Sequence, residues 1–546
     1  MSRVNATFLG KASDVDEVDT FQVDVIGDIL DNCRTWQFQT IFIIYLTKIP
    51  TAFFMACIVY SAPIPQRVPI HCMDTDALIA IKHPTIVSVD DKVFHLSFCD
   101  TFADIKDHAN RHYGNESYEM PWTVPESDTV VNNRSNIIPC DLFNFKSGKS
   151  VTTYDVVCSR GGFVVVTQGM HLVGIFLSGI ALRYALKVIS PKNVLRSAMI
   201  LQIICGNIAG LVESFVVHLI FRALAAIGCA AAFGAGSVIF SDITRGRFKQ
   251  SAIVLFDTFW SIGIVILSFI TEYESRWTQL YLVISYPTLI IVVLTIWMPD
   301  SPRWLLSHGD IDGTFKLLVH AAECCDLKDN LPANLAFKLK LQAMQLLRHR
   351  RQATWSSLWQ YTASTSLRVL STHIAFACFT IMYFGMVLNM RNYGRYQLPS
   401  SARFLALSEL TGCFVGYLFV TKTKHTFLWS GIFNVLGASV AFCIWFWKSR
   451  EVEFVNEGIL LYFCLILKAS VSSSFGILSA CGADSLKKDA KTVMMFSSVL
   501  CGRLFLLNAP VIVALGQFYG EYVPLTVFAT LGAIGGLCMI VIDSIS

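Results

Sequence analysis

The sequence predicts an all-α polytopic membrane protein with about twelve transmembrane helices in two halves of six. Three observations lead to this fold class. The 546 residues are 54% hydrophobic and only 15% charged, with a mean hydropathy of +0.54, and a soluble domain cannot bury that much apolar surface. Apolar runs of about 20 residues, enough to cross a bilayer as a helix, recur about twelve times. Basic residues cluster on alternate connections between these runs.

The predicted spans follow one another with short connections, except in two places. They cover residues 36–60, 162–182, 194–213, 215–240, 250–270, 277–298, 367–388, 398–420, 426–447, 457–480, 492–516 and 522–543. A polar segment of about 100 residues separates the first two spans, and one of about 70 separates the sixth from the seventh; both exceed an ordinary loop. Six spans, a linker and six spans indicate two helical halves that face one another.

The distribution of lysine and arginine predicts the orientation. Basic clusters follow the second, fourth, sixth, eighth and tenth spans, among them Lys187 and Lys192, Arg245 and Arg247, and Lys487 and Lys488. Because cytosolic connections are enriched in basic residues, both termini are expected inside the cell. The N-terminus is acidic and lacks a signal peptide, so the first span is expected to act as its own insertion signal.

The orientation assigns each segment to a compartment. The expected domains are a cytosolic N-terminal segment at 1–35, transmembrane helix one at 36–60, an extracellular loop at 61–160, transmembrane helices two to six within 161–298, cytosolic linker helices at 299–366 and transmembrane helices seven to twelve within 367–546.

The loop at 61–160 carries features of the secretory pathway. Asn115 and Asn133 each begin a glycosylation acceptor sequence. Four loop cysteines form an even set, which in an oxidising compartment indicates two disulfides with three possible pairings: Cys72, Cys99, Cys140 and Cys158. These features favour a multi-pass glycoprotein of the plasma membrane.

The step from the sixth span into the linker has the most specific local sequence. Residues 299–305 read Pro-Asp-Ser-Pro-Arg-Trp-Leu. Ser301 can cap a new helix, Pro302 fits its first turn, and Arg303 belongs on the cytosolic side. This order resembles the signature that follows the sixth helix in sugar and organic-ion transporters of the major facilitator superfamily.

Other segments resemble the organic-ion transporters of that superfamily, the carriers of organic cations, anions and carnitine. They are the long cysteine-bearing loop and residues 152–158, 357–359, 383–385, 468–475 and 503–510. The resemblance implies the major facilitator fold and secondary transport of a small organic ion by alternating access between the two halves.

The chain departs from this resemblance in its cytosolic connections. The family carries an Asp-Arg and Gly-Arg-Arg element between its second and third helices, whereas residues 181–187 contain neither acid nor glycine. The acids that remain after the fourth and tenth spans are Asp242 and Asp484. This loss leaves open a transporter-like protein that binds or signals without moving substrate. A sugar-type facilitator is a further alternative.

Ionisable residues inside the predicted spans are the main candidates for function, because a charge at mid-bilayer costs about 2.5–3.5 kcal/mol. They are Lys48, Arg222, Asp257, Glu409, Lys468 and Arg503. By resemblance, cation carriers have an aspartate at the position of Arg503, and anion or carnitine carriers have an arginine. A guanidinium suits a carboxylate or sulfate. Glu409 matches the acid of cation and carnitine carriers, so the two together favour an organic anion or zwitterion over a simple cation.

The remaining site predictions follow from these charges and from the need of organic ions for apolar walls. The predicted substrate-binding residues are Arg503, Glu409, Lys48, Tyr383 and Phe384. Lys48 either adds charge to the cavity or pairs with Asp257. The predicted gating and scaffold residues are Arg222, Asp257, Lys468, Asp242, Asp484, Pro302 and Arg303.

Other function classes lack support in the sequence. No second titratable residue stands at helical spacing from His171, His218 or His373, which argues against a proton relay. No nucleotide-binding loop, hydrolase motif or metal-binding cluster is present, so we expect no enzyme activity, cofactor or metal. The expected partners are a small organic ion and the lipid bilayer, not nucleic acid. Substrate identity, coupling ion and oligomeric state stay open.

Overall fold

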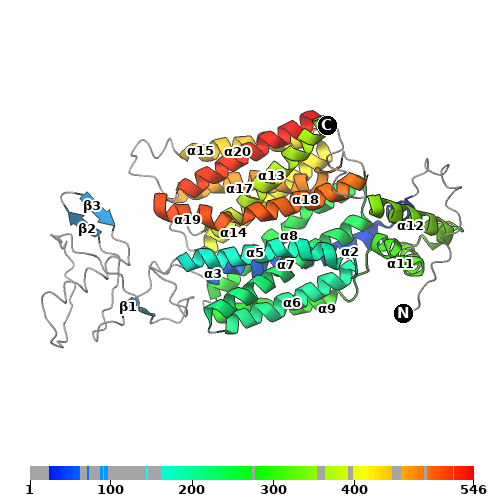
Figure 1. Ribbon diagram of the computed structural model, residues 1–546, viewed down its shortest axis with the longest axis horizontal. Coiled ribbons are helices and arrows are strands. Elements are labelled where there is room, and N and C mark those ends of the chain that lie inside the picture. The colour runs from blue at the N-terminus through cyan, green and yellow to red at the C-terminus, as the bar shows by residue number, and fades with distance from the viewer. Residues whose placement is uncertain are drawn as a thin grey trace.

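The protein is a bundle of long helices with a group of short helices at one end (Figure 1). The computed structural model describes residues 24–61, 70–72, 86–89, 92–95, 143–145, 162–212, 214–273, 277–352, 363–390, 398–444, 457–484, 488–520 and 522–545. The short helices α10 (Pro302–Ser307), α11 (Ile311–Glu323) and α12 (Leu335–Gln352) define what we call the linker end. The structure also has four short strands, of which β1, β2 and β3 are labelled at the opposite, or loop, end (Figure 1).

The bundle consists of two sets of helices that follow one another in the chain. The first half contains α2 (Arg34–Leu46), α3 (Lys48–Ser61), α5 (Gly162–Ala185), α6 (Pro191–Leu211), α7 (Phe215–Ile243), α8 (Gly246–Tyr273) and α9 (Trp277–Leu294). The second half contains α13 (Ala363–Leu388), α14 (Leu398–Lys422), α15 (Thr426–Phe442), α17 (Glu457–Cys481), α18 (Lys488–Leu506), α19 (Ala509–Tyr519) and α20 (Tyr522–Ile545).

The predicted number of spans agrees with the helices. Ten described segments are long and apolar enough to cross a membrane, and two shorter apolar helices, Gln279–Leu294 and Thr426–Phe442, bring the number to the expected twelve. The fold class is thus confirmed for the bundle. The loop range at 61–160 differs from a purely helical protein, because β1 (Ile70–Cys72) pairs with β4 (Phe143–Phe145) and β2 (Ile86–Val89) pairs with β3 (Lys92–His95), both antiparallel.

Two predicted spans are interrupted rather than continuous. The first breaks at Thr47, between α2 and α3, and the eleventh breaks between Leu506 and Ala509. Each break lies just before a proline, Pro50 or Pro510, whose ring clashes with the carbonyl four residues earlier and whose nitrogen donates no hydrogen bond. The first break places Lys48 at the start of a new helix inside the membrane.

The two halves meet along several pairs of helices. Helix α8 packs against α14 and α17, while α5 packs against α18 and α19. Inside the first half, α5 and α7 approach closely at Gly174, where an added Cβ would lie 2.3 Å from the carbonyl oxygen of Ala223. Small residues at such crossings let helix backbones come together without a side chain between them.

The linker begins as the sequence predicts. The Ser301 hydroxyl accepts a hydrogen bond of 3.0 Å from the Trp304 backbone N–H, and Pro302 occupies the first turn of α10. The Trp304 indole donates to the Leu186 carbonyl at 2.7 Å, which ties α10 to the connection between α5 and α6. The linker helices are therefore anchored to the first half.

Candidate functional site

The buried charges of the first half form an ion pair. Lys48 Nζ in α3 lies 3.0 Å from Asp257 Oδ1 in α8, and the two residues are 4% and 9% exposed. Phe233 and Phe256 enclose the ammonium group, with ring centroids 3.3 and 4.4 Å from Nζ. Of the two possibilities that the sequence left open for Lys48, the structure has the pairing with Asp257.

The buried charges of the second half form another pair. Glu409 Oε2 in α14 lies 3.3 Å from Lys468 Nζ in α17, and both side chains are fully buried. The Tyr383 hydroxyl of α13 donates to Glu409 Oε1, and Lys468 Nζ donates to the Tyr383 carbonyl at 2.9 Å. Glu409 is thus neutralised by Lys468, a partner that sequence reasoning did not assign to it.

The two pairs face one another where the halves meet, since α8 packs against α14 and α17. The charge of Lys48 interacts electrostatically with Glu409, and Glu409 with Asp257. We call Lys48, Asp257, Glu409 and Lys468 the charge cluster. With one lysine for each carboxylate, its net charge is zero, which lowers the cost of burying it.

Arg222 lies within the first half, away from this cluster. It is 2% exposed in α7; its guanidinium donates to the Tyr281 hydroxyl of α9 and contacts Cys57 Sγ of α3 at 3.9 Å. These contacts join three helices of one half, in keeping with a scaffold role.

Arg503 lies between the halves. It is 8% exposed near the end of α18, and its Nη1 donates to the Ile175 carbonyl of α5 at 3.2 Å. A Cβ at Gly179, one turn further along α5, would lie 3.1 Å from the same nitrogen. Among the described residues, no carboxylate forms an ion pair with Arg503. Within the described part of the chain, the group opposite its charge is therefore a backbone carbonyl.

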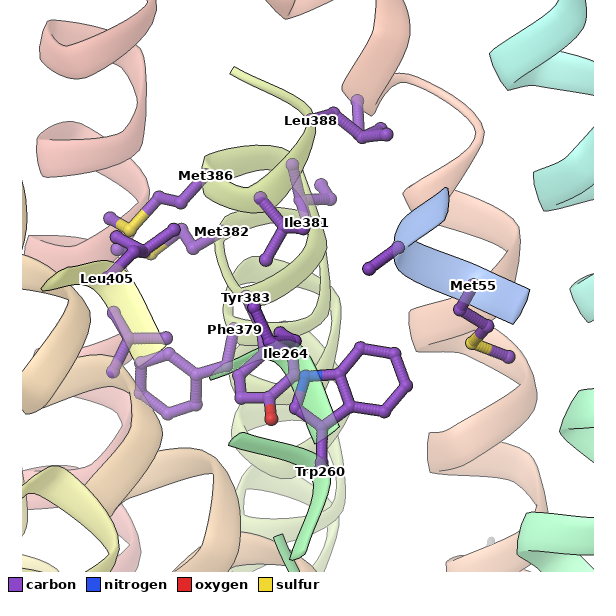
Figure 2. Close-up of a cluster of buried hydrophobic side chains, with 14 of the residues drawn as sticks. Met55, Trp260, Ile264, Phe379, Ile381, Met382, Tyr383, Met386, Leu388 and Leu405 are labelled. Carbon is purple, nitrogen blue, oxygen red and sulfur yellow. The ribbon is translucent and has the colours of Figure 1, made fainter. Parts of the chain in front are cut away.

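A hollow opens between the halves beside this arginine. Its cavity volume is about 20 Å³, which is room for about one water molecule, and α3, α5, α8 and α13 form its walls. Its lining residues are Met55, Ala56, Ile58, Gln168, His171, Leu172, Ile175, Trp260, Phe384, Val387 and Leu388. In Figure 2, Trp260 points into the space between Met55 of α3 and Leu388 of α13. Ile175 lines the hollow and offers its carbonyl to Arg503, so the two features adjoin.

The linker end is held by charged residues from several elements. Arg303 donates to the Asp242 carbonyl at 3.0 Å and to Asp24 Oδ2 at 2.9 Å, and Ser301 donates to the Asp242 carboxylate. Burial alone would raise the pKa of the Asp24 carboxyl, but the hydrogen bond and charge of Arg303 outweigh it and lower this pKa from 3.8. Asp24 immediately precedes α1 (Val25–Leu30). An acid of the N-terminal segment therefore pairs with the basic Arg303, whereas the connection at 181–187 has no acid to offer.

Polar contacts at both ends join the two halves. At the linker end, Gln250 of α8 donates to Asp484 Oδ2 at 2.7 Å, and Lys491 also contacts Asp484. At the loop end, Arg403 Nη1 of α14 lies 2.6 Å from Glu272 Oε2 of α8. We call these the linker-end and loop-end contacts.

The predicted substrate-binding residues do not form a single group. Phe384 lines the hollow and Arg503 adjoins it, whereas Lys48, Glu409 and Tyr383 belong to the charge cluster and its hydrogen bonds. Sequence reasoning missed Gln168 and considered His171 only as a relay. A signal existed, because Gln168, His171 and Ile175 recur at helical spacing on one face of the second span.

Several loop predictions concern residues that are not described. Cys99, Cys140, Cys158, Asn115 and Asn133 lie outside the described residues, and Cys72 is described only as a backbone position of β1. The disulfide and glycosylation predictions therefore stay predictions.

Known proteins with similar sequences are membrane transporters. The chain is 22% identical over 450 residues to solute carrier family 22 member 12 of Rattus norvegicus, with 77% of this chain and 76% of that protein covered. It is 22% identical over 396 residues to the organic cation transporter protein of Drosophila melanogaster, with 71% and 70% covered. It is 23% identical over 436 residues to solute carrier family 22 member 1 of Sus scrofa, with 77% and 75% covered.

Solved structures and the family pattern agree on the fold. A proton:xylose symporter bound to a bromodeoxyglucose aligns with a TM-score of 0.58 at 11% identity, over 91% of this chain and 95% of that one. A partially occluded, inward-open xylose transporter from E. coli aligns with a TM-score of 0.57 at 10% identity, over 92% and 98%. The Major Facilitator Superfamily pattern matches residues 161–510, more than half of the chain. This chain therefore belongs to the major facilitator superfamily, as a divergent relative of its organic-ion transporters, and is a transporter rather than an enzyme.

Proposed function

We propose that the protein is a secondary carrier of organic anions, which bind at the hollow when the halves separate and widen it, with their acidic group directed to Arg503. The main support is the charge of Arg503, which has no carboxylate opposite it among the described residues. Similarity to a protein named as an organic cation transporter supports the wider class of organic ions.

The distribution of buried charge favours anions over cations and zwitterions. Asp257 and Glu409, the buried acids of the charge cluster, are each neutralised by a lysine. The residues that line the hollow include no acid, so a cationic group there meets no carboxylate in the lining. An anion about 4 Å from Arg503 gains about 4 kcal/mol at an effective dielectric constant of about 20.

Substrate binding would also act on the contact between the halves. The Arg503 hydrogen bond to the Ile175 carbonyl joins α18 to α5. A carboxylate is a stronger acceptor than a carbonyl, because both partners are then charged. An anion that replaces the Ile175 carbonyl as the acceptor for Arg503 breaks this hydrogen bond between α5 and α18. Substrate binding is thereby coupled to the relative motion of the halves.

Uptake into proteoliposomes tests the proposal with three substrates that share one aromatic body and carry a carboxylate, a carboxamide or a trimethylammonium group. Wild-type protein should take up the carboxylate best. Arg503→Asp should lower carboxylate uptake about tenfold or more and raise that of the ammonium compound, while Arg503→Lys keeps the preference. Lys422→Asp is the matched control, because it makes the same charge change at an exposed position of α14.

Two results would contradict the proposal. Unchanged selectivity in Arg503→Asp would reduce this residue to a structural contact. Anion binding to purified protein without uptake would support the alternative of a transporter-like binding protein that does not move its ligand.

We also propose that the loop end faces the outside of the cell and that the protein resides in the plasma membrane. The glycosylation acceptors Asn115 and Asn133 support this orientation, since acceptors are used only on the lumenal side of the secretory pathway. Glycosidase treatment should increase the electrophoretic mobility of wild-type protein and leave the double variant Asn115→Gln, Asn133→Gln unchanged. A wild-type band that does not shift would count against this orientation.

A further inference from the structure

Helix α12 of the linker exposes a row of apolar side chains. Phe337 is 62% exposed, Met344 54% and Leu347 41%. With the exposed Lys340 they stand at intervals of three, four and three residues, which places all four on one side of the helix. We call this side the outer face. A contiguous exposed row of apolar residues marks a surface that binds something, whereas single exposed apolar residues do not.

The opposite side of α12 already has its partners. Leu335, Leu339 and Ala343 are buried in the apolar core of the linker end, and α12 packs against α1, α10 and α11. Gln342, on this inner side, donates to Asp24 Oδ1 at 3.0 Å and accepts from the Ile26 backbone N–H at 3.3 Å. The inner side therefore holds the helix in the fold, and the outer face is left for another purpose.

The charge of α12 indicates what the outer face binds. The helix contains no acidic residue and five basic ones: Lys338, Lys340, Arg348, Arg350 and Arg351. Lys340 lies on the outer face itself, between Phe337 and Met344. Basic and apolar residues on one side of a helix are typical of helices that lie in the headgroup region of an anionic membrane. There the apolar groups enter the bilayer, while lysine stems lie along it and place their ammonium groups among the headgroups.

The position of α12 brings such a surface within reach. Besides its contacts within the linker, α12 packs against α18, which is part of a segment long and apolar enough to cross the membrane. Figure 1 shows α12 just beyond the ends of the bundle helices. The helix thus lies close to the level at which the chain leaves the bilayer, and the bilayer surface is the nearest partner that is both apolar and able to carry negative charge.

We infer that the outer face of α12 docks on the adjacent membrane surface and selects anionic phospholipids. Phe337 and Met344 enter the layer below the headgroups, and Lys338 and Lys340 lie against the anionic headgroups. A basic residue beside such a surface strengthens binding about fivefold. This contact involves neither the hollow nor Arg503, so it holds whatever substrate the protein carries.

Hydrogen exchange followed by mass spectrometry tests the docking on the full chain, with one copy in each lipid nanodisc. The discs contain phosphatidylcholine alone or a mixture with phosphatidylserine. In the mixture, the amides of residues 337–347 should exchange about fivefold more slowly or less readily still. Lys338→Glu with Lys340→Glu should abolish this difference between the lipids, and so should Phe337→Ser with Met344→Ser.

The matched control is Lys422→Glu with Lys424→Glu, which makes the same charge change at two exposed positions at the end of α14. It should keep the slower exchange of α12 in the mixture. Since the altered residues of the outer face are exposed, thermal unfolding of these variants should match that of wild type.

Three outcomes would overturn the inference. Equal exchange of wild-type α12 in both lipids would show that no anionic surface covers the outer face, and this comparison needs no variant. Loss of the difference in the control as well would show a general effect of charge. Slower exchange in phosphatidylcholine discs on addition of soluble glycerophosphoserine would show binding of a free headgroup without docking on the bilayer. Each of these results leaves the proposed role of Arg503 untouched.

Discussion

At the scale of single residues, the ion pair between Lys48 and Asp257 shows how this bundle carries charge inside a membrane. The two groups lie 3.0 Å apart on α3 and α8, and aromatic rings surround the ammonium. Removing one partner leaves an uncompensated buried charge, whereas replacing both with apolar residues of similar size does not.

This difference predicts the outcome of a double-mutant cycle. Lys48→Met and Asp257→Leu should each destabilise the protein by about 3–5 kcal/mol, and the double variant should recover most of that loss. Thermal unfolding in detergent measures the stability, and uptake by the double variant shows whether the pair also has a part in transport. Additive losses in the double variant would rule out a direct pairing.

At this scale the sequence predicted which residues matter better than what they do. All six ionisable residues named from the predicted spans are buried in the bundle, because only a buried position explains a charge in an apolar run. Their pairing could not be read from the sequence. Lys468 neutralises Glu409 from another helix, and neither the residue types nor their spacing in the sequence predicts that the two side chains lie close together. Neither ring nitrogen of His171 has a hydrogen-bond partner among the described residues, and sequence alone does not show this.

At the scale of helices, close packing depends on glycines at particular crossings. An added Cβ at Gly174 would lie 2.3 Å from the carbonyl oxygen of Ala223 in α7. An added Cβ at Gly169 of the same helix would meet no atom of another described segment within 4 Å. The two glycines are five residues apart in one helix and differ in what surrounds them.

This contrast predicts opposite effects of one substitution. Gly174→Ala should destabilise the protein by about 1–3 kcal/mol through overpacking. Gly169→Ala should be neutral or stabilise it by up to about 1 kcal/mol, because alanine restricts the unfolded chain and favours a helix. Thermal unfolding of both variants under identical conditions measures the difference, and equal shifts would contradict the assigned crossing.

The N-terminal helix α1 is held to the linker through Asp24. The carboxylate accepts from Arg303 at 2.9 Å and from Gln342 of α12 at 3.0 Å. In return, Gln342 Oε1 accepts from the Ile26 backbone N–H at 3.3 Å. This arrangement supplies acids at the linker end, where the connection at 181–187 has none.

Asp24→Asn should therefore release α1 from α12 and lower the melting temperature more than Asp31→Asn does, since Asp31 reaches Arg245 only at 3.8 Å on the surface. Because the folded-state pKa of Asp24 lies below its ordinary 3.8, its contribution is present above that pH and is lost only as the pH falls through the lowered pKa. The difference between wild type and Asp24→Asn should stay constant between about pH 5 and pH 8. A difference that shrinks within this range would contradict the assignment.

At the scale of helices and strands, some features could not be predicted from sequence patterns. Apolar runs predicted twelve spans but not the breaks at Thr47 and after Leu506. Hydropathy measures side-chain polarity, so it does not report the break in the backbone that Pro50 or Pro510 causes. The four strands in the loop range were missed for a similar reason: segments of three or four residues are too short for a periodic signal.

At the scale of the whole molecule, the two halves are joined at both ends. Gln250 bonds to Asp484 at the linker end, and Glu272 pairs with Arg403 at the loop end. Alternating access requires one end to open while the other stays closed, so these contacts act on the equilibrium in opposite directions.

Substitutions at the two ends should therefore have opposite effects. Glu272→Gln should favour opening at the loop end and speed labelling of a cysteine placed at Leu388, inside the hollow, by a membrane-impermeant thiol reagent. Gln250→Leu should slow it. Exposed pairs contribute about 0.2–1 kcal/mol, which corresponds to changes of about 1.4- to 5-fold. Equal labelling rates in both variants would mean that neither contact controls access.

The uncompensated guanidinium of Arg503 has an electrical consequence. The charge cluster is neutral as a unit, so a bound monovalent anion cancels the remaining charge at the interface and the loaded carrier crosses the membrane field nearly without work. The empty carrier returns with that positive charge exposed to the field, which acts on it with up to about 2.3 kcal/mol per 100 mV. Membrane voltage would then set the rate of the return step, and a cell could regulate the direction of flux through its resting potential.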